Sequence, residues 1–153
     1  MAEPIVGKNG KVSLGANKVI GMGTWSLSGV QADEFDASQF GDNWKQYVYG
    51  MKDGGSVSFS GWFDPTDSTG QIALQVANLD NLALTSMRFY YNSTSYYEAC
   101  QTTGFFGPGA LSTGQNTLPS NMRITSFNIG FDKAGLGTID FTAKVSGVLV
   151  RAN

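Results

Sequence analysis

Residues 50–65 contain two turns and, between them, a run in which small polar and apolar residues alternate. This run constrains the fold more than any other part of the chain. Serines occupy one set of alternating positions and apolar residues the other: Ser56, Ser58 and Ser60 against Val57 and Phe59. Because successive side chains of a strand point to opposite faces of a sheet, the run predicts a strand with one hydroxyl face and one apolar face. A small, uncharged hydroxyl face indicates a surface that packs against something or lets something slide past it.

Length and composition predict one domain, spanning residues 1–153, that is long enough to bury a core. The chain has 20 glycines, 41% hydrophobic residues, only 14% charged residues and a net charge of −2. Charged residues usually make up about 25% of a soluble domain. We therefore expect a folded protein with many turns, which covers much of its surface by assembling.

Short strands separated by turns predict a mainly β protein. The expected strands span residues 11–14, 19–28, 55–63, 82–92, 122–132 and 138–151, and the last two form a hairpin. Ile72, Val76 and Leu79 recur at helical spacing, which predicts a helix at about 69–79 with Ser68 or Thr69 as its N-cap.

Two stretches, residues 30–50 and 98–121, lack strand periodicity and are predicted to be long loops. Phe40, Trp44 and Tyr47 stand at helical spacing among acidic residues, which predicts a short helix in the first loop. These aromatics either extend towards a partner or fold back onto their own core.

The residues that usually carry catalysis are scarce. The chain has no histidine, and its single cysteine, Cys100, can form no internal disulfide. Asp64 and Asp67 are better explained as turn residues than as a calcium or glycosidase pair. We expect no catalytic residue, no cofactor and no metal site, and therefore a protein that is not an enzyme.

The start of the chain lacks the features of a signal peptide, and no apolar stretch approaches the ~18 residues of a membrane span. We therefore expect no membrane partner and synthesis inside the cell. The basic residues are scattered, which argues against a nucleic-acid-binding patch.

The order of these segments resembles that of the major tail tube proteins of long-tailed bacteriophages. The resemblance runs from about residue 19 to 150 and rests on the acidic stretch, the glycine and serine run at 50–61, Phe63-Asp64-Pro65, the short helix, Ile124-Thr125-Ser126-Phe127 and Val145-Ser146-Gly147. It implies a β-sandwich or half-barrel with one short flanking helix and long loops. It also implies hexameric rings that stack into a virion tail tube for DNA ejection, with a non-contractile tail favoured.

The same resemblance implies which surfaces are used. In this family the inner sheets join around the channel, so we expect lumen-facing residues at Ser56, Ser58, Ser60, Asp140, Thr142 and Ser146. Lys144 shares that alternation and requires an acidic partner, Asp140 or a neighbour, if the wall is not to attract DNA. The long loops are expected between subunits, through Phe40, Trp44, Tyr47, Phe105 and Phe106.

The partners implied are further copies of the chain, the tape measure, tail tip and tail terminator proteins, and double-stranded DNA in passage. Localisation in the virion tail follows, after synthesis in the host cytoplasm. Two alternatives stay open: a tube subunit of a type VI secretion system or phage-tail-like particle, and a carbohydrate-binding β-sandwich or adhesin. The second would use Trp25, Trp44 and Trp62 as a sugar-stacking platform.

Overall fold

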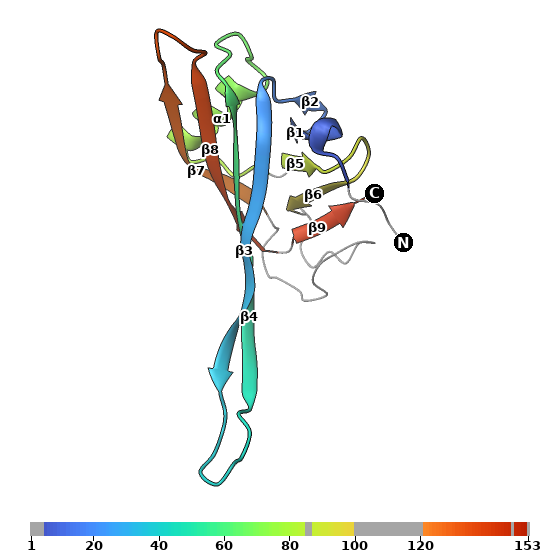
Figure 1. Ribbon diagram of the computed structural model, residues 1–153. Coiled ribbons are helices and arrows are strands. Elements are labelled where there is room, and N and C mark those ends of the chain that lie inside the picture. The colour runs from blue at the N-terminus through green and yellow to red at the C-terminus, as the bar shows by residue number, and fades with distance from the viewer. Residues whose placement is uncertain (1–4, 85–86, 100–120, 148, 153) are drawn as a thin grey trace.

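Two antiparallel sheets pack against each other in the computed structural model, which describes residues 5–84, 87–99, 121–147 and 149–152 (Figure 1). Sheet A has the strand order β2-β1-β5-β6-β9 and sheet B the order β3-β4-β8-β7. The strands of sheet A are β2 (Asn17–Lys18), β1 (Lys11–Leu14), β5 (Met87–Tyr90), β6 (Tyr96–Ala99) and β9 (Leu149–Ala152). Those of sheet B are β3 (Met22–Asp36), β4 (Tyr47–Trp62), β8 (Thr138–Ser146) and β7 (Asn121–Gly130).

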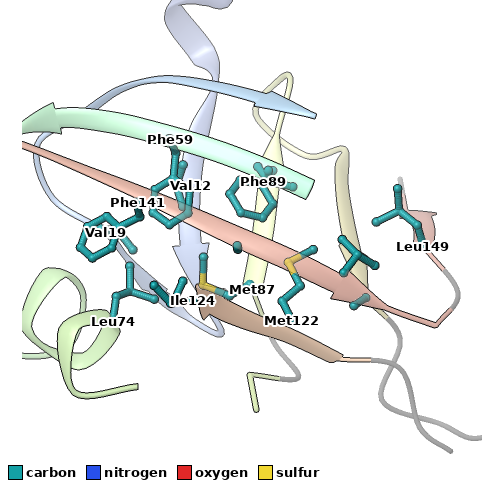
Figure 2. Close-up of a cluster of buried hydrophobic side chains, with 14 of the residues drawn as sticks. Val12, Val19, Phe59, Leu74, Met87, Phe89, Met122, Ile124, Phe141 and Leu149 are labelled. Carbon is teal, nitrogen blue, oxygen red and sulfur yellow. The ribbon is translucent and has the colours of Figure 1, made fainter. Parts of the chain in front are cut away.

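The core lies between the two sheets and is rich in aromatic rings (Figure 2). Phe59 of β4 stacks on Phe141 of β8 within sheet B, with ring centroids 5.2 Å apart. Across the core, Phe59 approaches Phe89 of sheet A at 5.4 Å. These three side chains are almost completely buried, and each such aromatic removes a large apolar area from water.

One helix, α1 (Gln71–Leu79), flanks β7 and inserts Leu74 into the core beside Ile124 (Figure 2). A short 3-10 turn, η1 (Gly7–Asn9), precedes β1. The predicted fold class, a mainly β sandwich with one short flanking helix, is confirmed. Among the described residues, no helix is long and apolar enough to cross a membrane.

The start of α1 is held by buried polar side chains instead of the predicted Ser68 or Thr69 cap. Gly70 is the N-cap residue, and Asp67 Oδ2 accepts hydrogen bonds from Gln71 N and Ile20 N at 3.0 and 2.9 Å. The Gln71 side chain is fully buried and donates from Nε2 to Ile20 O and Trp62 O. The prediction of the cap was wrong because a carboxylate one residue earlier satisfies two backbone N–H groups at once.

The largest error of the sequence-based prediction concerns residues 30–50. No helix forms there, because β3 and β4 continue through this region as a paired hairpin, and only residues 37–46 form the connection between the two strands. The spacing of Phe40, Trp44 and Tyr47 was misleading because the hairpin has no buried face in this region, so no apolar alternation marks its strands.

Three further boundaries differ from the prediction. The strand predicted at 82–92 is the shorter β5, preceded by an isolated pairing of Leu84 with Met122. The strand predicted at 138–151 breaks at Gly147, whose φ of 92° is readily adopted only by glycine, so that β8 and β9 join different sheets. The first and last residues of the loop predicted at 98–121 belong to β6 and β7. Residues 100–120, with Phe105 and Phe106, lie outside the described residues.

Candidate functional site: a hydroxyl face and a projecting arm

The outward side of sheet B carries small polar side chains on all four strands. The pairing of β4 with β8 sets Ser58 opposite Thr142 and Ser60 opposite Asp140. On the other side of β4, Ser26 and Ser28 of β3 pair with Ser58 and Ser56. We call this surface the hydroxyl face; its residues are Thr24, Ser26, Ser28, Ser56, Ser58, Ser60, Asp140, Thr142, Lys144, Ser146, Arg123, Ser126 and Asn128.

The predicted alternation along β4 is confirmed, since Val57 and Phe59 are buried while Ser58 is exposed and Ser56 and Ser60 are partly exposed. The candidate lumen residues of β4 and β8 therefore share one surface. That this surface faces a channel stays a prediction.

The sequence-based prediction did not include the residues that β3 and β7 contribute to the hydroxyl face. Thr24, Ser26 and Ser28 alternate with the inward-facing Trp25 and Leu27, and this pattern could have revealed them. On β7 a register shift between Ile124 and Ser126 breaks the alternation, so the pairing with β8 is needed to find Ser126 and Asn128.

Charges on the hydroxyl face are paired in part with neighbours. Lys144 Nζ lies 2.8 and 3.0 Å from the two carboxylate oxygens of Asp53. Asp53, not Asp140, is thus the acid that offsets this lysine. Asp140 instead accepts a hydrogen bond of 2.9 Å from Asn128 Nδ2. The guanidinium group of Arg123 donates a hydrogen bond to the backbone carbonyl of Asn81.

The hydrogen bond from Lys144 is also the largest cause that holds the pKa of Asp53 below its ordinary value of 3.8. The backbone N–H of Gly55 donates a second hydrogen bond to Asp53, at 2.8 Å, and acts in the same direction. Asp53 is therefore ionised at neutral pH and keeps the Lys144 cation engaged.

Beyond the body of the molecule, the β3–β4 hairpin extends as a two-stranded arm, which we define as residues 31–52 (Figure 1). The pairing of β4 with β8 ends at Ser56, so the arm has no third strand among the described residues. Every residue from 33 to 52 is exposed. An isolated two-stranded hairpin is marginally stable in water, so the arm needs a partner surface to become firmly ordered.

The arm carries apolar side chains that nothing in the described part of the chain covers. Trp44, in the connection at its tip, is 84% exposed, and Met51 is 82% exposed. The predicted interface residues Phe40 and Tyr47 are exposed as well. Of the two alternatives left open by the sequence, the structure contradicts the one in which these aromatics fold back onto their own core; their place in a subunit interface stays a prediction.

A glycine shapes the middle of the arm. A Cβ atom at Gly50 would lie 3.0 Å from Cε2 of Phe35 and 3.3 Å from Cβ of Asp33. Gly50 therefore lets the Phe35 ring lie across the neighbouring strand, next to a register shift between Ala32 and Glu34.

Sheet B also presents backbone edges. β3 forms one edge and β7 the other. The first part of β7 is covered, because Met122 exchanges backbone hydrogen bonds with Leu84 and Ile124 O accepts from Asn78 Nδ2. Within the described residues no backbone partner is found for the outer edge of β7 from Ser126 onwards, which leaves a strand edge available for pairing.

The three tryptophans do not form one platform. Trp25 is partly buried against Phe89, and its Nε1 donates to Tyr90 O at 3.0 Å. Trp44 is at the tip of the arm, and Trp62 ends β4 at the opposite end of the hairpin. The sugar-stacking platform proposed from sequence is therefore wrong in its geometry.

Asp64 and Asp67 serve local structure, as the turn interpretation predicts. Asp64 Oδ1 accepts from Thr66 N and Thr66 Oγ1 at 2.9 and 2.7 Å, and these hydrogen bonds lower the pKa of Asp64. Asp67 is engaged at the start of α1. Within the described ranges, no group of three or more Cys, Asp or Glu side chains could hold a metal ion.

Comparison with solved structures shows what this architecture is similar to. The chain superposes on one from the virion of a native gene transfer agent particle with a TM-score of 0.70 and 14% identity, over 97% of this chain and 98% of the other. A chain from the tail of an empty gene transfer agent particle with C6 symmetry superposes with a TM-score of 0.69 and 15% identity, over 97% of this chain and 98% of the other. The sheath/tube terminator of an extracellular contractile injection system superposes with a TM-score of 0.65 and 13% identity, over 99% of both chains.

No protein-family model matches the chain, and no curated protein is similar enough in sequence to count as a match. The structural likenesses extend over almost the whole chain and establish a tail-tube-like fold, in agreement with the resemblance found from sequence. The similar chains belong to gene transfer agent particles and to an extracellular contractile injection system.

Proposed function

We propose that this protein is a self-assembling tube subunit whose copies form stacked hexameric rings around a channel for DNA. The observation that carries the proposal is the hydroxyl face together with the arm: one broad polar surface and one projection with uncovered apolar side chains in the same small chain. The likeness to a tail with C6 symmetry supports the ring, with the virion tail as its location.

The ring would close through sheet B. In this sheet β3 and β7 run antiparallel to each other, because each successive pair of strands is antiparallel. A rotated copy could set its β3 beside the free edge of β7 at residues 126–130, which would continue the antiparallel order. Such a contact joins two different patches, so it closes into a ring when the rotation fits.

The hydroxyl face would then line the channel. DNA carries about one negative charge per 1.7 Å of axis, and free lysines or arginines on the wall would retain it by releasing counterions. On this face Lys144 is paired with Asp53, the charge of Arg123 is matched by that of Asp140 on the same face, and serine and threonine hydroxyls can hold a layer of water. The wall therefore lets DNA slide without binding it specifically.

Further copies of the chain are thus the main partners, and tape measure, tail tip and terminator proteins would complete the tail. A non-contractile tail remains the prediction from sequence. A tube subunit of a phage-tail-like particle is the second candidate, favoured by the likeness to the contractile injection system. DNA inside the native particle would support the first function, and a DNA-free particle the second.

Electron microscopy of the purified chain, concentrated and stained, tests assembly directly. We expect stacked rings or short tubes, with a sedimentation coefficient that rises with protein concentration. A chain that stays monomeric at all concentrations, alone and mixed with its own tail tip complex, would contradict the proposal. Binding of a glycan array by such monomers would instead favour an adhesin.

A further inference from the structure

A cleft of about 650 Å³ opens between the start of β3 and the β1–β5 part of sheet A. Trp25, Tyr90, Tyr91 and Tyr97 are among the residues that line it. The hydrogen bond from Trp25 to the Tyr90 carbonyl joins the two sides, and the rings of Tyr91 and Tyr97 lie 5.6 Å apart. The cleft is therefore a preformed aromatic site, of a size that takes small ligands or bulky side chains.

The side of the molecule that bears the cleft is basic. Lys11 lines it, with Nζ 4.4 Å from the centre of the Tyr90 ring. Lys8, on η1, lies between two further lining residues, Gly7 and Gly10. Residues 5–20 contain three lysines and no acidic residue.

The arm has the complementary chemistry. It carries four acidic residues against two lysines, and all six are exposed. The acids are Asp33, Glu34, Asp36 and Asp42. At the tip, Phe40 and Trp44 supply large apolar side chains that would be buried in an aromatic cleft. An acidic arm with an aromatic tip thus matches a basic, aromatic cleft.

The arm cannot reach the cleft of its own chain. Met22, at the start of β3, lines the cleft, whereas the tip begins after Asp36, at the end of the same strand. At ~3.3 Å per residue, the two ends of β3 are about 45 Å apart. Figure 1 shows the arm pointing away from the part of the body formed by β1, β2 and η1. Any arm that fills the cleft must come from another copy.

We propose that the arm of one copy docks in the Trp25–Tyr90 cleft of the next, with Trp44 as its apolar anchor. This proposal rests on the proposed function and specifies one contact of the assembly. Because the arm and the cleft are different patches at opposite ends of one hairpin, the contact is head to tail, and such a contact forms an open repeat when its rotation does not close. Since the pairing of β3 with β7 already supplies the contact within a ring, we assign the arm–cleft contact to successive rings along the axis of the tube.

Charge reversal on both sides tests this contact. One variant, Lys8→Glu with Lys11→Glu, makes the cleft acidic, and another, Asp33→Lys with Glu34→Lys, makes the arm basic. Each variant alone opposes like charges, so we expect the critical protein concentration for tube formation at low salt to rise about tenfold or more. A chain with all four substitutions pairs opposite charges again and should recover most of this loss.

Circular dichroism and thermal melting of the monomers check that each variant folds. If Lys11→Glu unfolds the monomer because Lys11 packs on Tyr90, Lys8→Glu with Lys18→Glu replaces the cleft variant, since both lysines are exposed. Trp44→Ala provides an uncharged counterpart and should also raise the critical concentration.

Two results would overturn the docking. In one, both charge variants assemble like the wild type. In the other, the four-substitution chain assembles no better than the weaker of the two charge variants, which would leave the cleft to another occupant such as the N-terminal residues. In either case wild-type tubes would still support the proposed function, whereas its failure would appear as a wild-type chain that forms no assembly.

Discussion

Gln71 shows how one residue can tie three parts of the body together. Its side chain is fully buried, donates to the carbonyls of Ile20 and Trp62, and accepts from Asp64 N at 2.9 Å. Gln71→Ala would remove the partners of these backbone groups, whose hydrogen bonds are part-buried, at about 1–3 kcal/mol for each group that water cannot then reach. We expect a loss of about 3 kcal/mol in the free energy of unfolding, measured by urea denaturation of the monomer.

An exposed glutamine provides the control for this prediction. Gln39, at the tip of the arm, is exposed, and the Gln39→Ala change should alter the unfolding free energy by less than about 0.5 kcal/mol. Equal losses in the two variants would contradict the role given to the Gln71 hydrogen bonds.

Ser58, at the middle of the hydroxyl face, is the residue at which a charge should affect DNA most. Ser58→Arg adds a cation at an exposed position whose backbone pairs are unchanged, so the subunit should still fold and assemble. We expect slower DNA ejection from particles, with a stronger dependence on salt, because phosphates would exchange counterions with the new guanidinium. Ejection rates followed by dye fluorescence measure this effect.

Ser68→Arg makes the same chemical change in the turn before α1, outside the hydroxyl face. Particles with this variant should eject DNA at the wild-type rate. A Ser58→Arg particle that also ejects at that rate would argue against the channel assignment.

The Asp53–Lys144 pair predicts a pH dependence of defined sign. Because the folded-state pKa of Asp53 lies below its ordinary value, the pair stabilises the folded chain above about pH 4 and loses this contribution as pH falls through the lowered pKa. In Lys144→Met the pKa of Asp53 should rise towards the ordinary value. The chemical shift of the Asp53 carboxyl carbon, followed by NMR from pH 2 to 7, gives the titration midpoint in the wild type and in Lys144→Met. Equal midpoints in the two proteins would contradict the pairing.

At the scale of elements, the sequence predicted those strands whose apolar and polar residues alternate cleanly. The β7–β8 hairpin, the body part of β4 and α1 follow from their periodicity, and so does the hydroxyl face along β4 and β8. The arm could not be found in this way, because its two strands have no buried face and thus no apolar alternation to detect.

The cleft and the Asp53–Lys144 pair also could not be predicted from the sequence. Lys144 and Asp53 are 91 residues apart, and only the pairing of β4 with β8 brings them together. The cleft joins the start of β3 to strands of the other sheet, and periodicity carries no information on how two sheets are placed.

The arm predicts a local stability that changes on assembly. In the monomer its amides should exchange with solvent quickly, since opening a two-stranded hairpin without a buried face costs little. In tubes the same amides should become at least tenfold more protected. Hydrogen exchange read by mass spectrometry, on peptides covering residues 31–52, measures the change.

Peptides from β8, which is paired on both sides, provide the internal reference and should be slow in both states. Arm amides that exchange equally fast in tubes and monomers would show that the arm stays free in the assembly. That outcome would remove the arm from every proposed subunit contact.

At the scale of the whole molecule, low charge, an uncovered arm and a polar sheet face have a common explanation in assembly. A monomer with 14% charged residues and a row of exposed aromatics is poorly suited to remain alone in water. Sheet B would supply the channel wall and the lateral contact, while the arm and cleft would supply the axial one. A single chain of this kind could thus build a tube through these two contacts.

A cryo-electron microscopy reconstruction of the assembled tube would test the proposed assembly. We predict stacked rings of six copies in which Ser58 and Thr142 point into the channel and β3 of one copy pairs with β7 of the next. A tube whose channel is lined by sheet A, with the hydroxyl face turned outwards or buried between rings, would contradict it.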